Sequence, residues 1–304
     1  MTNLAESNLA GTTIGFIGLG LMGKPMARNL AAAGAKLVVN NRSQGVIEEL
    51  AKEGMTPAAT PREAAEKSDI VICMLPDTPT LEKILTGPDG VFAAPIQGKL
   101  VIDMGTSKLL ATRALAAKAL ELGAEYLDAP VSGGTVGAEA GNLTIMAGGS
   151  DEAFARAEPL LQVMGAKITH VGATGAGQVA KAANQVIVGL NIGAVAEALS
   201  LAQAAGVDPG KVREALGGGF ADSRILELHG LRMVEGKFTP GARCPIQRKD
   251  MDQAMELADH LGIELPATSL SRDLYDRVID AGDGDLDHSG LIRAIRPDWP
   301  VNER

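Results

Sequence analysis

The chain has 304 residues, which is long for a single hydrophobic core and suits two domains. A hydrophobic content of 46% and 37 glycines fit a compact α/β protein and exclude a disordered one. A formal charge of −9 and an aromatic content of 3% argue against a nucleic-acid or anionic-membrane partner, because such binding needs cationic surface and stacking needs aromatic rings.

The N-terminal residues and the cysteines indicate the cellular compartment of the protein. Residues 1–11 have neither the basic start nor the apolar run of a signal peptide, so they are predicted to form a flexible leader. Cys73 and Cys244 lie far apart and are interpreted as free thiols in a reducing compartment. We therefore expect a cytoplasmic protein.

A glycine-rich motif follows the first predicted strand. Thr12 to Ile17 is a short apolar run typical of a buried strand, a helix pattern extends to Ala33, and Lys36 to Asn40 predicts a second strand. Between the first strand and the helix lies a G-x-G-x-x-G sequence made of Gly18, Leu19, Gly20, Leu21, Met22 and Gly23. In this context the motif predicts dinucleotide binding rather than a plain glycine turn. The pyrophosphate is expected at the helix N-terminus.

The residues after the second strand indicate the cofactor. An NAD site has an acidic side chain there for the ribose hydroxyls. This chain has Asn41, Arg42 and Ser43 instead. Arg42 can pair with an adenosine 2′-phosphate, and Asn41 and Ser43 can hydrogen-bond it. We therefore favour NADP(H) over NAD(H); the alternative is that Arg42 is only solvated surface.

Strands and helices continue to alternate as far as Val171. Further strands are predicted at residues 69–76, 100–106, 124–130, 142–149 and 167–171. This alternation predicts an α/β fold with a doubly wound, mostly parallel Rossmann sheet. Ligands bind such sheets at the carboxyl ends of the strands, so Leu75, Pro76 and Thr106 are further candidates for cofactor contact.

A second glycine motif begins at Asp128. Ser132, Gly133 and Gly134 offer one hydroxyl and successive backbone amides, which can form a nest for an anion. A substrate carboxylate is the expected guest. The alternative is a mobile glycine loop.

The third motif is a long apolar helix with one lysine. Lys181 is the only charged residue between Lys167 and Glu197, and it shares a helical face with Asn184 and Gln185. The plain alternative is a lysine whose ammonium reaches solvent along the helix. A buried or interface helix explains this segment better than a membrane span, because polar residues interrupt it.

Beyond this helix the patterns predict helices only, near residues 208–217, 222–235, 249–262, 266–281 and 288–296. The predicted organisation is a leader (1–11), an NAD(P)-binding Rossmann domain (12–173), a long interdomain helix (174–204) and an all-α C-terminal domain (205–304). The boundary then falls at the lysine helix, which would place Lys181 near a cleft.

Other chemistries find little support in the sequence. The four histidines show neither HExxH nor paired spacing, so no metal is expected. Residues 283–287 start like a calcium loop, but His288 stands where glycine is required. No G-x-S-x-G of a serine hydrolase occurs.

Taken together, these motifs resemble the β-hydroxyacid dehydrogenase family over residues 12–296. The matching motifs are Gly15 to Ala27, Asp128 to Gly134, and Gly175 to Gln185, with a fourth match at Lys249-Asp250-Met251. The chain is most similar to the family's group that reduces tartronate semialdehyde to glycerate. One departure is Gln247, where that group tends to have histidine.

The resemblance implies an oxidoreductase with specific residue roles. Hydride would pass between nicotinamide and a carbonyl carbon, and Lys181 would protonate the alkoxide. Ser132, Gly133 and Gly134 would hold the substrate carboxylate. Asn184 or Gln185 would orient Lys181 or the substrate, and Lys249 would reach towards the cofactor.

The resemblance also leaves alternatives and implies an assembly. Succinic semialdehyde or glyoxylate reduction and 3-hydroxyisobutyrate oxidation remain open, as does a non-catalytic NADP-binding scaffold, although scaffolds are expected to lack the lysine. The family commonly forms homodimers or homotetramers through its helical domain.

Overall fold

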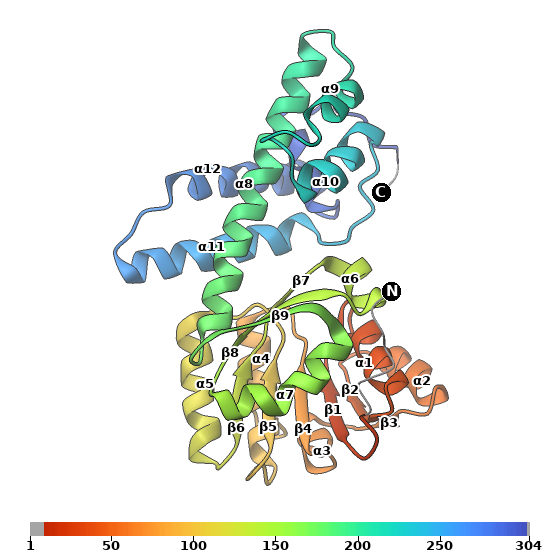
Figure 1. Ribbon diagram of the computed structural model, residues 1–304, viewed down its shortest axis with the longest axis vertical. Coiled ribbons are helices and arrows are strands. Elements are labelled where there is room, and N and C mark those ends of the chain that lie inside the picture. Colours follow the sequence, from red (N-terminus) through yellow and green to blue (C-terminus); the bar gives the residue numbers. More distant parts are fainter. Residues whose placement is uncertain (1–8, 303–304) are drawn as a thin grey trace. The chain divides into compact units, whose positions relative to one another are not determined.

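The computed structural model describes residues 9–302. The chain divides into two compact units, one ending at Lys181 and the other beginning at Ala182 (Figure 1). Of the predicted leader, residues 1–8 lie outside the described residues. Leu9 is buried, and its backbone N–H donates to Ala33 O at 3.0 Å.

The first unit is built on one sheet. Its strands are β1 (Thr13–Ile17), β2 (Lys36–Asn40), β3 (Thr56–Pro57), β4 (Ile70–Cys73), β5 (Leu100–Asp103), β6 (Glu125–Asp128), β7 (Val131–Ser132), β8 (Leu143–Gly148) and β9 (Gly165–Gly172). The order is β3-β2-β1-β4-β5-β6-β8-β7, with β9 on β8. Strands β1 to β6 pair in parallel, while β8 is antiparallel to β6 and β7. The predicted mostly parallel Rossmann sheet is confirmed.

Helices cover both faces of this sheet, as Figure 1 shows. They are α1 (Gly23–Ala32), α2 (Gln44–Lys52), α3 (Pro61–Glu66), α4 (Thr78–Thr86), α5 (Leu109–Glu121), α6 (Gly134–Ala140) and α7 (Asp151–Met164), with the short 3₁₀ turn η1 (Val91–Ala93). One core lies under α1, α2, α6 and α7, and a second lies under α3, α4 and α5. The residues of β1, β2, β4, β5 and β6 are almost all buried on both faces, which explains the continuous apolar runs of these strands.

The lysine helix is α8 (Ala176–Ala204), a single helix of 29 residues that passes from the first unit into the second. By length and composition it could cross a membrane. Its later turns instead supply Ile192, Val195, Ala196 and Leu199 to the core of the second unit. A core helix of a folded unit therefore accounts for its hydrophobicity.

The second unit is helical, apart from an isolated bridge between Arg243 and Asp287. Its remaining elements are α9 (Pro209–Leu216), α10 (Arg224–Glu235), α11 (Cys244–Leu261), α12 (Pro266–Val278), a π-helical turn η2 (Ile279–Asp283), the 3₁₀ turn η3 (His288–Leu291) and α13 (Ile292–Ile295). The prediction that α11 begins at residue 249 is wrong. Because Pro245 fits the first helical turn, where its missing N–H costs nothing, the helix begins five residues earlier.

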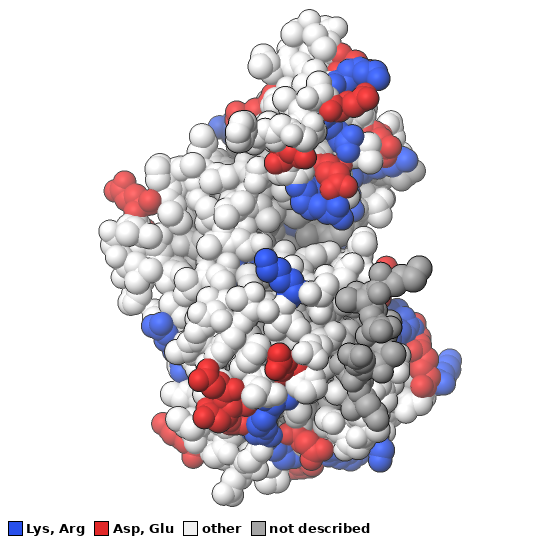
Figure 2. Space-filling view, in the orientation of Figure 1, with Lys and Arg blue, Asp and Glu red and all other residues white. Residues whose placement is uncertain are grey.

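Charged side chains of both signs are interspersed on the face of each unit that Figure 2 shows. Ion pairs also join α1 to α2, where Arg28 pairs with Glu49 at 2.7 Å and with Glu53 at 2.5 Å. These pairs are largely exposed and contribute little individually. On this face, no extended basic area suggests a polyanionic partner.

Candidate active site

The three glycines of the first motif differ in what a side chain would meet at each position. Gly18 has φ +95°, and a side chain there would also collide with Met74 O. A Cβ at Gly23 would collide with Gly18 O, so the loop and α1 pack backbone to backbone. At Gly20, by contrast, a Cβ would meet nothing within 4 Å, so this residue borders open space. This pattern fits a turn that lets a pyrophosphate approach the N-terminus of α1, alongside Leu21 and Met22.

Asn41 supports the glycine loop. Its Oδ1 accepts a hydrogen bond from the backbone N–H of Leu19 at 3.1 Å, and its Nδ2 donates to Ser43 O at 3.3 Å. The carboxamide oxygen is therefore used by the protein, and an amide N–H remains for a ligand. Arg42 is exposed and pairs with no carboxylate among residues 9–302. It stays available for an anionic group.

The other predicted cofactor contacts follow neighbouring strands of the same sheet edge. Leu75 and Pro76 come directly after β4, and Thr106 comes after β5. A Cβ placed on Gly18 would lie 3.0 Å from Leu75 Cδ2, which shows that the β1 and β4 loops are in contact. Leu75 therefore borders the loop with the open glycine, and Pro76 and Thr106 follow strands of the same sheet.

The predicted carboxylate cradle begins on an edge strand that was not expected. Ser132 ends β7, paired with Thr144 of β8, and is half-buried. Gly133 and Gly134 follow with φ of +135° and +61°, and both are exposed. A Cβ on Gly134 would meet nothing within 4 Å, so glycine is needed there for its backbone conformation and leaves the amide accessible.

Lys181 lies in the second turn of α8 and has 7% of its surface exposed. Burial of a lysine is uncommon, so the interpretation that this lysine extends along the helix into solvent is wrong. Asn184 and Gln185 follow it by one helical turn.

Within the second unit, Gln185 is the centre of a polar network. Its Nε2 donates to Asp250 Oδ2 at 2.6 Å and to Gln247 Oε1 at 3.1 Å, while Gln247 Nε2 donates to Gln185 O at 3.0 Å. Lys249 Nζ lies 3.0 Å from Asp250 Oδ1. The predicted residues Gln185 and Lys249 are therefore joined through one carboxylate of α11.

This network fixes the orientation of Asn184. Because the Asp250 carboxylate can only accept, Gln185 must present its NH₂ group to it. The Gln185 Oε1 then accepts from Asn184 Nδ2 at 2.7 Å. Asn184 is left with its own oxygen as an acceptor that no residue in the described part of the chain uses. Gln185 thus links α8 to α11, and Asn184 Oδ1 is the hydrogen-bond acceptor that is left for a ligand.

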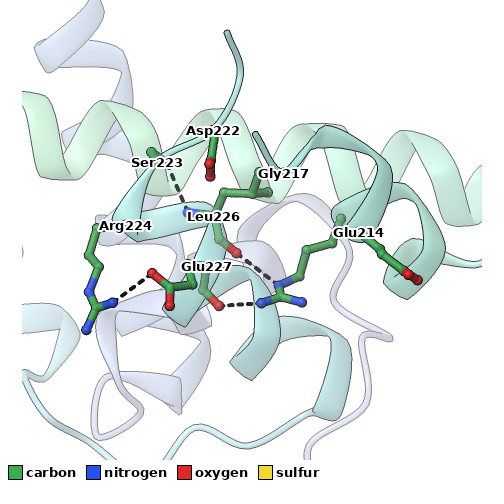
Figure 3. Close-up of a pocket in the computed structure, with 8 residues that line it drawn as sticks. Glu214, Gly217, Asp222, Ser223, Arg224, Leu226 and Glu227 are labelled. Carbon is green, nitrogen blue, oxygen red and sulfur yellow. Dashed lines mark hydrogen bonds and ion pairs between the residues drawn. The ribbon is translucent and has the colours of Figure 1, made fainter. Parts of the chain in front are cut away.

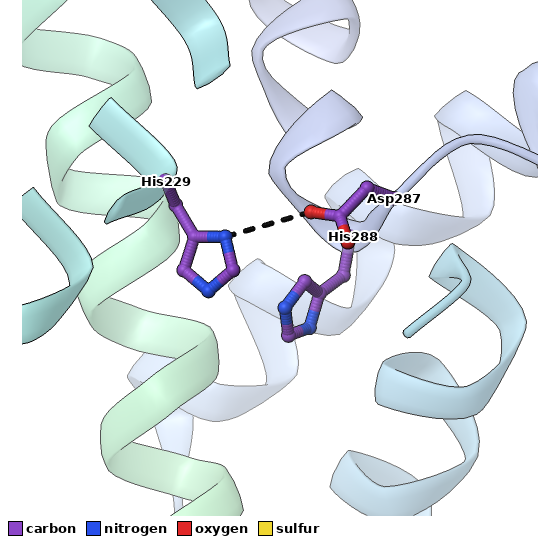
Figure 4. Close-up of side chains that lie close together, drawn as sticks. All are labelled: His229, Asp287 and His288. Atoms are coloured by element: carbon purple, nitrogen blue, oxygen red, sulfur yellow. Dashed lines mark ion pairs between the residues drawn. The ribbon is translucent and has the colours of Figure 1, made fainter. Parts of the chain in front are cut away.

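A cluster in the second unit was missed from sequence because its members are far apart. His229 of α10 and the adjacent Asp287 and His288 converge, with His229 Nδ1 3.5 Å from Asp287 Oδ1 (Figure 4). Burial would raise the pKa of Asp287, but His229, His288 and Arg232 outweigh it and hold that pKa well below its usual range.

The carboxylate of this cluster is already used. Asp287 Oδ2 lies 2.6 Å from Arg232 Nη1 and accepts from Gly241 N at 2.9 Å. Oδ1 accepts from Ser289 N and Oγ at 3.1 and 2.7 Å. Since an arginine already neutralises it, the cluster suits a structural tie between two loops better than a cation.

A hollow of about 470 Å³ lies between α9 and α10 (Figure 3). Arg213 donates to Leu226 O at 3.1 Å and to Glu227 O at 2.7 Å, and Arg224 pairs with Glu227 at 2.7 Å. Both arginines are thus held by α10. None of the predicted site residues lines this hollow.

The fold and the glycine loop fit a dinucleotide-binding protein, and known proteins narrow the class. Residues 13–172 match the family described as NAD binding domain of 6-phosphogluconate dehydrogenase. Residues 175–295 match the family described as NAD-binding of NADP-dependent 3-hydroxyisobutyrate dehydrogenase. The two matches cover both units.

Individual relatives align with nearly the whole chain. The chain is 46% identical to 2-hydroxy-3-oxopropionate reductase of Escherichia coli, covering 93% of this chain and 96% of the relative. It is 35% identical to NAD-dependent L-serine dehydrogenase of Pseudomonas aeruginosa, covering 93% and 98%. The solved 3-hydroxyisobutyrate dehydrogenase of Mycobacterium tuberculosis with L-serine superposes with a TM-score of 0.86 at 33% identity, covering 94% and 99%.

The chain therefore belongs to the 3-hydroxyisobutyrate dehydrogenase family of β-hydroxyacid dehydrogenases. It is an NAD(P)-binding enzyme of the class that acts on the CH–OH group of hydroxyacids. The family resemblance predicted from the three motifs is confirmed.

Proposed function

We propose that this enzyme reduces tartronate semialdehyde to glycerate with NADPH. The observation that carries the substrate is the 46% identity to 2-hydroxy-3-oxopropionate reductase across both units. Arg42 supports the cofactor, because an exposed guanidinium stands where an NAD site has an acid. The serine and hydroxyisobutyrate relatives make other small hydroxyacids the alternatives.

Each site residue has a role in this proposal. Bound NADPH supplies the hydride. Lys181 Nζ donates a proton to the carbonyl oxygen as negative charge develops there. Ser132 and the amides of Gly133 and Gly134 hold the substrate carboxylate, and Asn184 Oδ1 accepts from the hydroxyl that forms. Lys249, oriented by Asp250, reaches towards the cofactor.

Initial rates on a substrate panel test the proposal. The panel contains tartronate, succinic and methylmalonate semialdehydes and glyoxylate, each with NADPH and with NADH. We expect the highest kcat/KM for tartronate semialdehyde with NADPH. A higher value for another substrate would replace the proposed one, and higher rates with NADH would contradict the interpretation of Arg42.

Lys181→Ala tests the proton donor. Loss of a positioned acid costs about 10²- to 10⁴-fold, so turnover should fall by that amount while NADPH binding, measured by fluorescence titration, is unchanged. Lys167→Ala is the matched control, because Lys167 is an exposed lysine on β9. Near-wild-type turnover in Lys181→Ala would remove this residue from the mechanism.

We also infer a homodimer or homotetramer, in the cytoplasm. Large apolar side chains of the second unit are exposed, among them Ile187 and Leu201 of α8 and Leu270 of α12, which supports burial against another copy. Buried free thiols at Cys73 and Cys244 support a reducing compartment. A monomer in light scattering would contradict the assembly, and a cell-envelope fraction would contradict the compartment.

A further inference from the structure

A buried carboxylate fixes the N-terminal turn of α8 to the sheet of the first unit. Asp128 is the last residue of β6, and its side chain is fully buried. Its Oδ1 accepts from Gly175 N at 2.6 Å, and its Oδ2 accepts from Gln178 N at 2.9 Å. The first N–H groups of a helix lack partners within the helix and carry partial positive charge. Asp128 therefore caps α8 from a distant strand.

Gln178 makes a second tie to the same sheet. Its Oε1 accepts from Ser107 N at 2.9 Å, and its Nε2 donates to Gly105 O at 3.0 Å. Asp103, the register partner of Asp128 on β5, accepts from Gly105 N at 2.9 Å and from Ser107 Oγ at 2.8 Å. The loop after β5 is thus held by one aspartate and the first turn of α8 by the other.

The backbone of α8 also touches the strands directly. A Cβ on Gly177 would collide with Met146 O and would lie 2.7 Å from Asp128 O. Only glycine lets the helix approach so closely. Three contacts of different kinds therefore determine where the first turn of α8 lies relative to β6 and β8.

We propose that Asp128 and Gln178 are positioning residues for Lys181, holding the helix turn from which its side chain extends. Lys181 follows Gln178 by three residues, so a shift of this turn moves the ammonium with it. Neither residue is assigned contact with the substrate. The inference rests on the proposed function, in which Lys181 donates the proton.

We call the contacts of Asp128 and Gln178 that hold the first turn of α8 the anchor. The protonation state of Asp128 makes this anchor depend on pH. Burial raises the pKa of Asp128 to about 6, and the backbone N–H groups of Gly175 and Gln178 only partly oppose this. A protonated carboxyl loses one acceptor and the negative charge that favours the helix N-terminus. The titratable or charged groups on the elements next to it are Asp103 on β5, Tyr126 on β6, Cys73 on β4, Arg113 of α5 beside Gly175, and Lys181 on α8.

Two variants weaken the anchor, one on the strand β6 and the other on the helix α8. Asp128→Asn keeps the shape but turns an NH₂ group towards one of the two helix N–H donors. Gln178→Met keeps the volume and removes the side-chain hydrogen bonds to Asp103, Gly105 and Ser107, so it tests the anchor if Asp128→Asn does not fold. Asp69→Asn is the matched control, because Asp69 precedes β4 at the opposite edge of the same sheet.

The kinetic readout separates positioning from binding. A misplacement of about 1 Å can cost on the order of 100-fold, so we expect kcat to fall tenfold to 100-fold in both variants. KM for NADPH should stay within about twofold in Asp128→Asn, because the glycine loop is untouched. The wild-type kcat should fall below pH 6, and this fall should be absent in Asp128→Asn. Unchanged kcat in both variants, or an equal loss in Asp69→Asn, would overturn the proposal.

Hydrogen–deuterium exchange tests the anchor without a substrate. Amides of residues 175–181 should exchange at least tenfold faster in both variants, with NADPH present and absent, and at the wild-type rate in Asp69→Asn. Unchanged exchange in the anchor variants would overturn the proposal even if turnover fell. If the wild-type enzyme reduced no semialdehyde while the exchange changed as expected, the proposed function would fail and the anchor would stand.

Discussion

Arg42 is the single residue on which the proposed cofactor preference depends. It is exposed and forms no ion pair within residues 9–302, so its charge is available to a 2′-phosphate. We predict that Arg42→Ala raises KM for NADPH about tenfold or more, since a charge-assisted hydrogen bond contributes about 1.5–3 kcal/mol. KM for NADH should change by less than twofold.

Steady-state kinetics with both cofactors check this prediction. Arg62→Ala is a suitable control, because Arg62 pairs with Glu66 of its own helix, α3. A parallel rise of both KM values would mean that Arg42 contacts the adenine or supports the loop instead of reading the phosphate.

Residue roles were predictable where one local motif sets them. The motif predicted the turn at Gly18 and the close packing at Gly23, because both lie within one strand-turn-helix unit; the approach of a pyrophosphate at Gly20 stays a prediction. The bond from Leu19 N to Asn41 was not predictable, since it depends on how two loops from different strands meet. The same reason hid the network of Gln185, which joins residues 62 and 65 positions apart.

At the scale of elements, Gln247 joins α8 to α11. It is 1% exposed, and it accepts from the Gln185 side chain and donates to the Gln185 carbonyl. Gln247→Leu removes both hydrogen bonds to Gln185, each of which contributes about 0.5–1.5 kcal/mol. We predict a lower melting temperature and a lower kcat, measured by calorimetry and steady-state kinetics.

A conservative change separates lost bonds from lost volume. Gln247→His can donate from one ring nitrogen and accept at the other, so it should retain most of the stability and turnover. Equal losses in Gln247→His and Gln247→Leu would show that the hydrogen bonds to Gln185 are not what matters at this position.

The presence of a helix or strand was easier to predict than the residues at which it begins and ends. Long apolar runs gave β1, β2, β4, β5 and β6, and periodicity gave the helices of the second unit. The edge strands β3 and β7 have two residues each, and too few side chains for any pattern. Their pairing is set by the neighbouring strand, so it becomes visible only in three dimensions.

For the whole molecule, the buried Asp128 predicts a specific pH dependence of stability. Its pKa rises from 3.8 to about 6 on folding, so between these values the folded state binds more protons than the unfolded state. This contribution to the free energy of unfolding is therefore present below pH 3.8 and is lost as pH rises through about 6. The loss is on the order of 3 kcal/mol.

Comparison with Asp128→Asn isolates this contribution. The difference in unfolding free energy, wild type minus variant, should fall as pH rises from about 4 to 7. Circular dichroism is the appropriate probe, because the single tryptophan, Trp299, lies in the second unit. A constant difference over this range would show that Asp128 titrates similarly in both states. The ionised form thus costs stability while it caps α8.

The helix α8 also limits how the chain can be shortened for separate study of its parts. A fragment ending at residue 172 removes Gly175 and Gln178, and leaves the buried Asp128 without those donors. A fragment beginning at residue 205 removes Ile192 and Leu199 from the second core. We expect both fragments to be insoluble on expression, whereas fragments 1–190 and 182–304 should be recovered in the soluble fraction.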